Sequence, residues 1–366
     1  MKAYRIAVIP GDGIGPEVTE VAMEVLQEAT EKVGSCRLEL TGFPWGSEYY
    51  LQRGAMMPSD ALSILQGYDA IYLGAIGDPR IPDHVSLDLL LDIRKGFDQY
   101  ANVRPVKLLE GVESPLRIEP GKVIDFTVIR ENTEGEYSRL GGRFKKGTDE
   151  ETAIQLAVFS RKRTREVMRY AFELARKRQA KSKDAPRPMV TNCTKSNALN
   201  YSMVMWDEIF QEVAGQYPDV HTDKAMVDAM TMWMLRKPDY YDVIVASNLF
   251  GDIITDLGAA IQGGMGLAAG GNINPERKYP SMFEPIHGSA PKYKGQNRSN
   301  PLAAIWSGAM MLDFIGASQE GDLVMEAIKT VLREKKVRTY DLGGNSTTTE
   351  VGRAVMEAMQ GESVKL

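Results

Sequence analysis

The chain has 366 residues, with 44 basic and 49 acidic side chains and a net charge of −5. This length is too great for one small core and predicts two domains or one large α/β unit. The slight acidic excess argues against nucleic-acid and anionic-membrane partners, because no surplus of cations is present to neutralise phosphates. An anionic ligand must therefore be bound by a few placed arginines.

Short apolar runs alternate with helical patterns along the chain. Strands are expected at 6–9, 70–73, 123–129 and 243–246, and a helix at 17–32. One face of that helix is apolar, through Val18, Val21, Ala22, Val25, Leu26 and Ala29. Strands that alternate with helices predict an α/β fold with parallel strands.

The two cysteines, Cys36 and Cys193, are far apart and lack the spacing of a metal site. They are expected to be reduced and inert, as in a cytoplasmic protein. The N-terminal apolar run leads straight into Pro10 and Gly11, without the pattern of a signal peptide. No stretch is expected to span a membrane, because the longest low-charge segment, 257–273, is rich in glycine.

The segment from Gly11 to Val18 (GDGIGPEV) follows a strand and opens a helix. Its glycines occupy every second position, whereas a dinucleotide fingerprint needs G-x-G-x-x-G. Pro16 suits the first turn of a helix. A tight turn into the helix is therefore favoured over a Rossmann phosphate loop.

Asp252 and Asp256 lie four residues apart after a strand and a turn. On a helix this spacing puts both carboxylates on one face, about 5–6 Å apart at Cβ. Their mutual repulsion is relieved by protonation or by a hard divalent cation such as Mg²⁺ or Mn²⁺. The alternative is a helix start that contains acids because they favour its dipole. Asp228 adds a third carboxylate within an apolar run, where an unpaired acid is costly.

Three arginines are candidates for carboxylate binding: Arg94, Arg104 and Arg130. The last two end apolar strand-like runs, and arginine is the usual bidentate partner of a carboxylate. Each of the three can also be explained as a structural ion pair. Lys195 and Tyr137 are possible proton-transfer groups, or else ordinary surface residues. His84 and His221 are expected at the surface or at helix ends.

Together these segments resemble the β-decarboxylating dehydrogenases, the family of 3-isopropylmalate, isocitrate, homoisocitrate, D-malate and tartrate dehydrogenases. The similarity runs from Ile9 to Gly344. Its most specific motifs are RENTEGEY at 130–137, NLFGDIITD at 248–256 and EPIHGSAP at 284–291. A family member that has become a non-catalytic, regulatory or RNA-binding subunit usually lacks metal or arginine positions, and all of them are present here.

The resemblance implies an α/β isopropylmalate-dehydrogenase-like fold of two domains with a mixed sheet, and not a Rossmann fold. It implies a discontinuous cofactor-binding domain of residues 1–100 and 258–366. Residues 101–257 would form a second domain that binds substrate and metal and makes a homodimer.

The resemblance also implies the roles of the site residues. Arg94, Arg104 and Arg130 match the arginines that bind substrate carboxylates, and Asp252 and Asp256 match metal ligands. Asp228, a further metal ligand, and Lys195 match residues contributed by the partner subunit, with Lys195 as the base. Tyr137 matches the group that protonates the enolate after decarboxylation.

The resemblance is greatest to the tartrate and D-malate branch, in the segments 82–87, 97–102, 203–208 and 275–277. Isocitrate enzymes place a serine for a third carboxylate where this chain has Asp88, which would repel it. Isopropylmalate enzymes surround the substrate's branch with leucines, which Leu87, Leu90 and Leu91 can supply. We therefore expect oxidative decarboxylation of D-malate or tartrate, with 3-isopropylmalate, or isocitrate and homoisocitrate, as alternatives.

The cofactor is expected to be NAD or NADP, bound by a set of residues that the resemblance implies: Ile14, Glu284, His287, Gly288, Ser289, Ala290, Lys292, Tyr293, Asn300 and Tyr340. NAD-using members have an acid after the HGSAP run for the ribose diol, whereas this chain has Lys292. Lys292, Tyr293 and Tyr340 match 2′-phosphate contacts of NADP-dependent isocitrate dehydrogenases, although a further arginine of that set is replaced by Gly344. A lysine cannot accept hydrogen bonds from a diol but can pair with phosphate, so NADP is favoured.

Overall fold

The computed structural model describes residues 2–181 and 188–361, and its chain forms two compact units. Unit 1 contains the chain up to Gln99, the segment Lys107–Pro120 and the chain from Ala259 onwards, and unit 2 contains Tyr100–Val106 and Gly121–Gly258. None of the described helices is long and apolar enough to cross a membrane.

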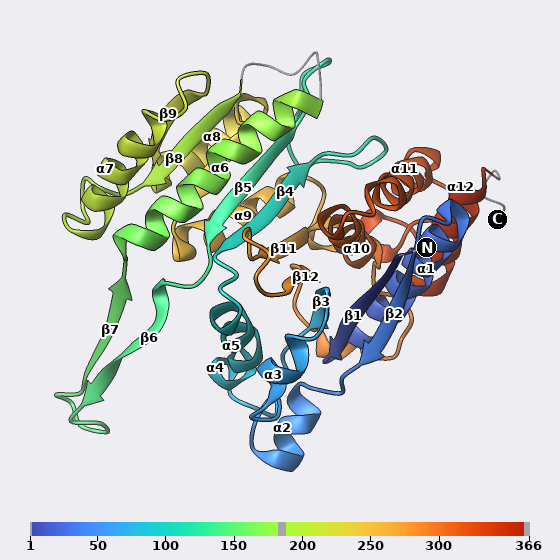
Figure 1. Ribbon diagram of the computed structural model, residues 1–366, viewed down its shortest axis with the longest axis horizontal. Coiled ribbons are helices and arrows are strands. Elements are labelled where there is room, and N and C mark those ends of the chain that lie inside the picture. Colours follow the sequence, from blue (N-terminus) through green and yellow to red (C-terminus); the bar gives the residue numbers. More distant parts are fainter. Residues whose placement is uncertain (1, 182–187, 362–366) are drawn as a thin grey trace. The chain divides into compact units, whose positions relative to one another are not determined.

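Unit 1 is built on five strands in the order β2-β1-β3-β12-β11. Strand β1 pairs in parallel with β2 and β3, β3 pairs in parallel with β12, and β12 pairs with β11 in antiparallel fashion. The elements, coloured blue to teal and orange to red in Figure 1, are β1 (Lys2–Gly11), α1 (Gly15–Val33), β2 (Cys36–Gly42), α2 (Ser47–Arg53), α3 (Ala61–Leu65), β3 (Ala70–Ala75), α4 (Asp83–Ser86), α5 (Asp88–Gly96), β11 (Ala269–Ile273), β12 (Ser281–Pro285), α10 (Leu302–Ile315), α11 (Ser318–Glu334) and α12 (Thr348–Gln360).

Unit 2 is built on strands in the order β4-β5-β10-β8-β9. Strands β5, β10, β8 and β9 pair in parallel. The elements are β4 (Ala101–Lys107), β5 (Asp125–Glu131), β6 (Gly135–Phe144), β7 (Thr152–Val158), α6 (Arg161–Lys181), β8 (Met189–Thr194), α7 (Ser202–Ala214), β9 (His221–Met226), α8 (Val227–Arg236), β10 (Val243–Ala246) and α9 (Asn248–Ile261). Strands β6 and β7 form a separate antiparallel hairpin that projects away from the other strands of the unit (Figure 1).

The sequence patterns explain the central elements. All six apolar residues expected on one face of α1 are buried, and β10 is buried on both faces, as expected of a strand in a parallel sheet. The predicted strands correspond to β1, β3, β5 and β10. Cys36 and Cys193 are free and buried, and burial raises the pKa of both thiols.

One segment lies elsewhere than expected. The predicted middle domain, 101–257, included residues 107–120, which pack with unit 1. The Lys107 backbone N–H donates to Gln262 Oε1 at 2.8 Å. At Gly111, where φ is +92°, a Cβ would lie 2.0 Å from a backbone oxygen of α11, so the chain approaches that helix more closely than a side chain would allow.

Candidate active site

In unit 2, the parallel strands place the predicted site residues at one edge. Arg130 is the penultimate residue of β5, Lys195 follows β8, Asp228 follows β9, and Asp252 is near the start of the helix that follows β10. The carboxyl ends of parallel strands lie at the same edge of a sheet, which is where ligands bind in open α/β folds. The site is therefore built from segments far apart in the sequence.

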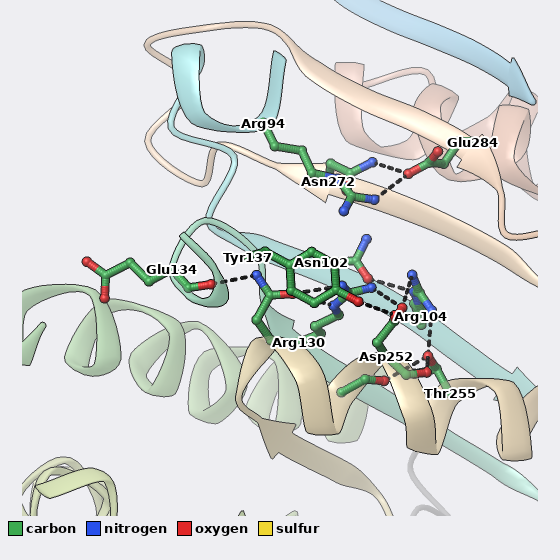
Figure 2. Close-up of polar contacts among 12 residues, drawn as sticks. Arg94, Asn102, Arg104, Arg130, Glu134, Tyr137, Asp252, Thr255, Asn272 and Glu284 are labelled. Atoms are coloured by element: carbon green, nitrogen blue, oxygen red, sulfur yellow. Dashed lines mark hydrogen bonds and ion pairs between the residues drawn. The ribbon is translucent and has the colours of Figure 1, made fainter. Parts of the chain in front are cut away.

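Asp252 and Arg130 form the centre of this group (Figure 2). Arg130, only 2% exposed, makes an ion pair from Nη1 to Asp252 Oδ1. Its Nε and Nη2 donate to Asn248 Oδ1 at 3.0 and 2.7 Å. A Cβ at Gly251 would lie 2.6 Å from Arg130 Cβ, so only glycine lets α9 approach the arginine so closely.

Arg104 reaches the same carboxylate from strand β4. Its Nη2 lies 3.5 Å from Asp252 Oδ1, its Nη1 donates to Thr255 Oγ1 at 2.5 Å, and its Nε donates to Asn102 Oδ1 at 2.7 Å. Arg104 is buried, so both guanidinium groups are held in place by neutral hydrogen-bond acceptors as well as by Asp252. Two buried guanidinium groups with fixed orientation form a site suited to carboxylates.

Tyr137 completes the group. Its hydroxyl donates to Asp252 Oδ2 at 2.8 Å, and the Arg130 guanidinium lies 5.3 Å from the centre of its ring. The turn before it is held by Glu131, whose Oε1 accepts the Thr133 backbone N–H at 2.8 Å. Burial raises the pKa of the Glu131 carboxyl, and its hydrogen bonds with Thr133 oppose that shift. The phenol is thus fixed as a proton donor facing the carboxylate.

Asp256 is one helical turn beyond Asp252. It is exposed, yet partial desolvation of its carboxyl group raises its pKa; the positive charge of Arg104 opposes the shift and the negative charge of Asp252 adds to it. Of the residues that the structure describes, none donates a hydrogen bond to this carboxyl group. Two neighbouring carboxylates, one with its oxygens available, fit a hard divalent cation.

Lys195 and Asp228 form a pair of their own. Lys195 Nζ lies 2.7 Å from Asp228 Oδ1, and this contact lowers the pKa of Asp228. Although Asp228 lies within an apolar run of the sequence, its side chain is 67% exposed and paired. Within residues 2–181 and 188–361, no three histidine, cysteine or acidic residues form a group suited to a metal, so one chain does not bring Asp228 together with Asp252 and Asp256.

Arg94 and Glu284 form a buried pair in unit 1. Arg94 Nη2 lies 2.9 Å from Glu284 Oε1, and Asn272 Nδ2 donates to the same oxygen at 2.8 Å (Figure 2). Arg94 Nε is buried without a hydrogen-bond partner. Arg94 therefore retains an N–H donor for an anionic ligand, although its guanidinium already forms an ion pair with Glu284.

The glycine-rich turn before α1 packs against the 287–290 segment. The Ile14 backbone N–H donates to the Ser289 carbonyl oxygen at 2.8 Å, and a Cβ at Gly13 would lie 1.9 Å from that oxygen. The expected tight turn is correct: Gly11 and Gly13 have φ values of +74° and +58°, and Pro16 is in the first turn of the helix. The alternating glycines therefore permit a backbone-to-backbone contact.

His287 follows β12 and lies beside exposed Gly288. Its Nδ1 is 3.1 Å from the Gly288 carbonyl oxygen, and its Nε2 is buried without a partner. Burial lowers the pKa of the imidazole, and the hydrogen bond with Gly288 opposes that shift. Ala290 has a φ of +38°, a conformation that residues with side chains rarely adopt. A neutral imidazole with one unpaired nitrogen suits a polar ligand at this turn.

Arg298 contacts the rings of Tyr293 and Tyr340, and Lys292 contacts the ring of Tyr293. Lys292 Nζ is 4.7 Å from the Tyr293 ring centre, and the Arg298 guanidinium is 5.1 Å from the ring centres of both tyrosines. Asn300 joins the two segments, because its Nδ2 donates to Asp341 Oδ2 at 2.9 Å.

The sequence analysis missed several residues that position the site: Asn102, Asn248, Thr255, Asn272 and Arg298. Asn102 had a detectable signal, since it lies two residues before Arg104 and therefore on the same face of a strand. The other four are brought to their partners by contacts between distant segments, which periodicity does not reveal.

Comparison with known proteins identifies the family. A family model for isocitrate/isopropylmalate dehydrogenase matches residues 5–355. The chain belongs to this family. A probable tartrate dehydrogenase/decarboxylase from Agrobacterium vitis is 47% identical over 366 residues, covering 100% of both chains. The decarboxylating D-malate dehydrogenase of Escherichia coli (strain K12) is 48% identical over 363 residues, covering 97% of this chain and 98% of that relative.

Among solved structures, the isocitrate dehydrogenase from Methylococcus capsulatus superimposes with a TM-score of 0.86 at 32% identity. The match covers 98% of this chain and 99% of that one. The predicted family and fold are therefore confirmed, and the expected enzyme class, a decarboxylating dehydrogenase, agrees with these relatives.

Proposed function

We propose that this chain oxidises and decarboxylates D-malate or tartrate, using Mg²⁺ or Mn²⁺ and a nicotinamide cofactor, preferably NADP. The observation on which the proposal rests is the convergence of Arg104, Arg130 and Tyr137 on Asp252. The two guanidinium groups balance the charges of Asp252 and Asp256. A divalent cation and a dianionic substrate can therefore enter together without leaving net charge in the site.

The residues of unit 2 fit the metal. Asp252 and Asp256 supply carboxylate oxygens at helical spacing, and Asp228 of the partner subunit would supply the third. Bound there, the metal would act as a Lewis acid towards the C2 oxygen of the substrate. The two arginines beside Asp252 would bind the substrate carboxylates, for which their bidentate geometry is suited.

Proton transfer is assigned to two side chains. Lys195 of the partner subunit would take the proton of the substrate C2 hydroxyl, and a bound nicotinamide would supply the hydride acceptor. After the β-carboxylate is lost, the Tyr137 hydroxyl donates a proton to C3. That hydroxyl is already oriented as a donor towards Asp252, which supports this role.

The cofactor is assigned to unit 1. The unpaired Nε2 of His287 and the open space around Gly288 fit a ligand at this turn. The buried contact between Ile14 and Ser289 fixes the backbone beside it. The preference for NADP is supported by Lys292, which cannot accept a hydrogen bond from a ribose diol.

The choice of substrate is supported by two observations. The relatives at 47–48% identity are named for tartrate and D-malate. At the start of α5, Asp88 would repel a third carboxylate such as that of isocitrate. Leu91 is buried and Leu90 packs against a hydrophobic core, so only Leu87, 39% exposed, remains to contact the branch of 3-isopropylmalate.

We also propose that the protein forms a homodimer and acts in the cytoplasm. Large apolar side chains are exposed on the β6–β7 hairpin and on α8, namely Leu140, Phe144, Ile154, Leu156, Met232, Trp233 and Leu235. Exposed apolar groups of this extent are typical of an interface.

The proposal is tested with purified protein against D-malate, the tartrate isomers, 3-isopropylmalate and isocitrate, each with NAD and NADP. Reactions contain Mn²⁺, Mg²⁺ or a chelator, and both reduced cofactor and released CO₂ are measured. We expect metal-dependent formation of both products with D-malate or a tartrate. Higher catalytic efficiency with 3-isopropylmalate or isocitrate would contradict the substrate assignment, and reduced cofactor without CO₂ would contradict the decarboxylation.

A further inference from the structure

Position 344 has no room for a side chain. The resemblance to NADP-dependent isocitrate dehydrogenases implies an arginine at this position. Here a Cβ on Gly344 would lie 2.1 Å from the Arg338 carbonyl oxygen and 2.7 Å from its Cβ. The Arg338 guanidinium donates hydrogen bonds to two backbone carbonyl oxygens, that of Lys335 at 3.3 Å and that of Leu342 at 3.4 Å. A second cation beside Lys292 must therefore come from another segment.

Arg298 is in the position to supply it. Its guanidinium lies 5.1 Å from the ring centres of Tyr293 and Tyr340, the two tyrosines expected at the 2′-phosphate. Contacts with the ring faces leave the edge N–H groups of a guanidinium available. Within the part of the chain that the structure describes, no residue forms a hydrogen bond or ion pair with this guanidinium.

The backbone on both sides of Arg298 is anchored to the start of α12. The Asn297 carbonyl oxygen accepts the Thr348 backbone N–H at 3.0 Å, and the Asn297 side chain exchanges hydrogen bonds with Thr349. The Ser299 carbonyl oxygen accepts the Thr348 hydroxyl at 2.7 Å. Arg298 is thus presented by a fixed segment, which reduces the entropy lost when its side chain binds a ligand.

We propose that Arg298 is a specificity-determining residue that binds the 2′-phosphate of NADP together with Lys292, in place of the arginine that position 344 cannot accommodate. This inference depends on the proposed preference for NADP. A guanidinium pairs with phosphate oxygens in a bidentate manner, and a lysine adds a point charge. Tyr293 and Tyr340 position the guanidinium through their ring faces.

The test measures binding of 2′,5′-ADP and 5′-AMP by isothermal titration calorimetry, with no substrate present. These two probes differ only in the 2′-phosphate. Wild type is expected to prefer 2′,5′-ADP. Arg298→Gln is expected to weaken 2′,5′-ADP about tenfold or more while changing 5′-AMP by less than about twofold. Arg298→Lys, which keeps the charge without the planar fork, should fall between them.

Arg353→Gln is the matched control, because it removes one exposed arginine from α12, the helix that anchors the Arg298 segment. It should leave both affinities unchanged. If wild type prefers 2′,5′-ADP and Arg298→Gln behaves like this control, the role of Arg298 is wrong while the NADP preference stands. An equal loss for both probes would also overturn the inference, since it indicates a general role in the adenosine site. If wild type does not distinguish the probes, the NADP preference is wrong and the inference with it.

Discussion

Two ion pairs of similar length illustrate how differently the two units treat charge. In unit 1, Arg94 and Glu284 are 2.9 Å apart, with side chains 4% and 10% exposed. In unit 2, Lys195 and Asp228 are 2.7 Å apart, with side chains 27% and 67% exposed. The first pair has a further partner in Asn272, whereas water screens the second.

The two pairs therefore differ in how firmly folding of a single chain fixes them. A buried charge is costly unless it is paired and hydrogen-bonded, so Arg94 and Glu284 are fixed by folding. An exposed pair contributes little to stability and can change partners readily. Lys195 and Asp228 are therefore suited to act in the active site of another subunit, as proposed above. Four experiments test this contrast between the two pairs.

Asp252 is intermediate between these extremes, since its side chain is 37% exposed and contacts two buried arginines. Asp252→Asn is expected to lower metal-dependent activity about a thousandfold or more, because the metal loses a charged ligand and several kcal/mol of charge stabilisation. The fold should persist, as asparagine keeps an oxygen for the arginines. Activity is measured at limiting Mn²⁺, with Asp219→Asn as the control for an exposed acid in the same unit. Near-normal turnover of Asp252→Asn would exclude this site.

The contrast in burial predicts a contrast in stability. Glu284→Gln leaves the buried Arg94 charge unpaired and should lower the free energy of unfolding by about 3–5 kcal/mol. Asp228→Asn removes an equally short contact at the surface and should leave the urea midpoint of unfolding close to that of wild type. Both variants are unfolded without metal at matched protein concentration, because an oligomer's stability depends on concentration. Similar losses in the two variants would contradict the contrast.

Exchange of subunits tests whether Lys195 acts across the dimer. Lys195→Ala and Asp252→Asn proteins are each expected to be inactive. In a heterodimer of the two, one site has neither lesion and the other has both. An equal mixture, in which half of the dimers are mixed, should therefore recover about a quarter of wild-type activity, given two-fold symmetry. The fraction of heterodimer is measured by mass spectrometry. Fully exchanged heterodimers that remain inactive would show that Lys195 does not act in the partner's site.

The sequence could predict features that depend on neighbouring residues. The buried face of α1, the strand β10 and the shared face of Asp252 and Asp256 all follow from spacing along the chain. The contiguous family motif at 130–137 suggested the role proposed for Arg130 in the same way. The glycine spacing before α1 also favoured a tight turn over a Rossmann loop.

The remaining features depend on contacts between distant segments. Asn248 is 118 residues from Arg130, and its hydrogen bonds to that arginine have no local signal. Arg298 occurs in a polar stretch typical of a surface loop, and only its two aromatic neighbours in space distinguish it. The exposure of Asp228 also has no local signal, because apolar neighbours in sequence do not determine which way a helix faces.

The smallest expected effect concerns the choice of cofactor. It depends on Lys292, whose exposed charge, like that of Lys195, is free to take a new partner. Lys292 lies over the ring of Tyr293, where a 2′-phosphate would replace solvent as its partner. Lys292→Asp removes that cation and supplies an acceptor for a ribose diol, so the preference should move towards NAD. A charge-assisted hydrogen bond contributes about 1.5–3 kcal/mol, so the ratio of kcat/KM for NADP and NAD should change roughly ten- to a hundredfold. Steady-state kinetics with both cofactors on wild type and variant measure the ratio, and Lys294→Asp controls for charge reversal two residues away. A wild type that already prefers NAD, and a Lys292→Asp protein with an unchanged ratio, would mean that Lys292 faces solvent like any surface lysine.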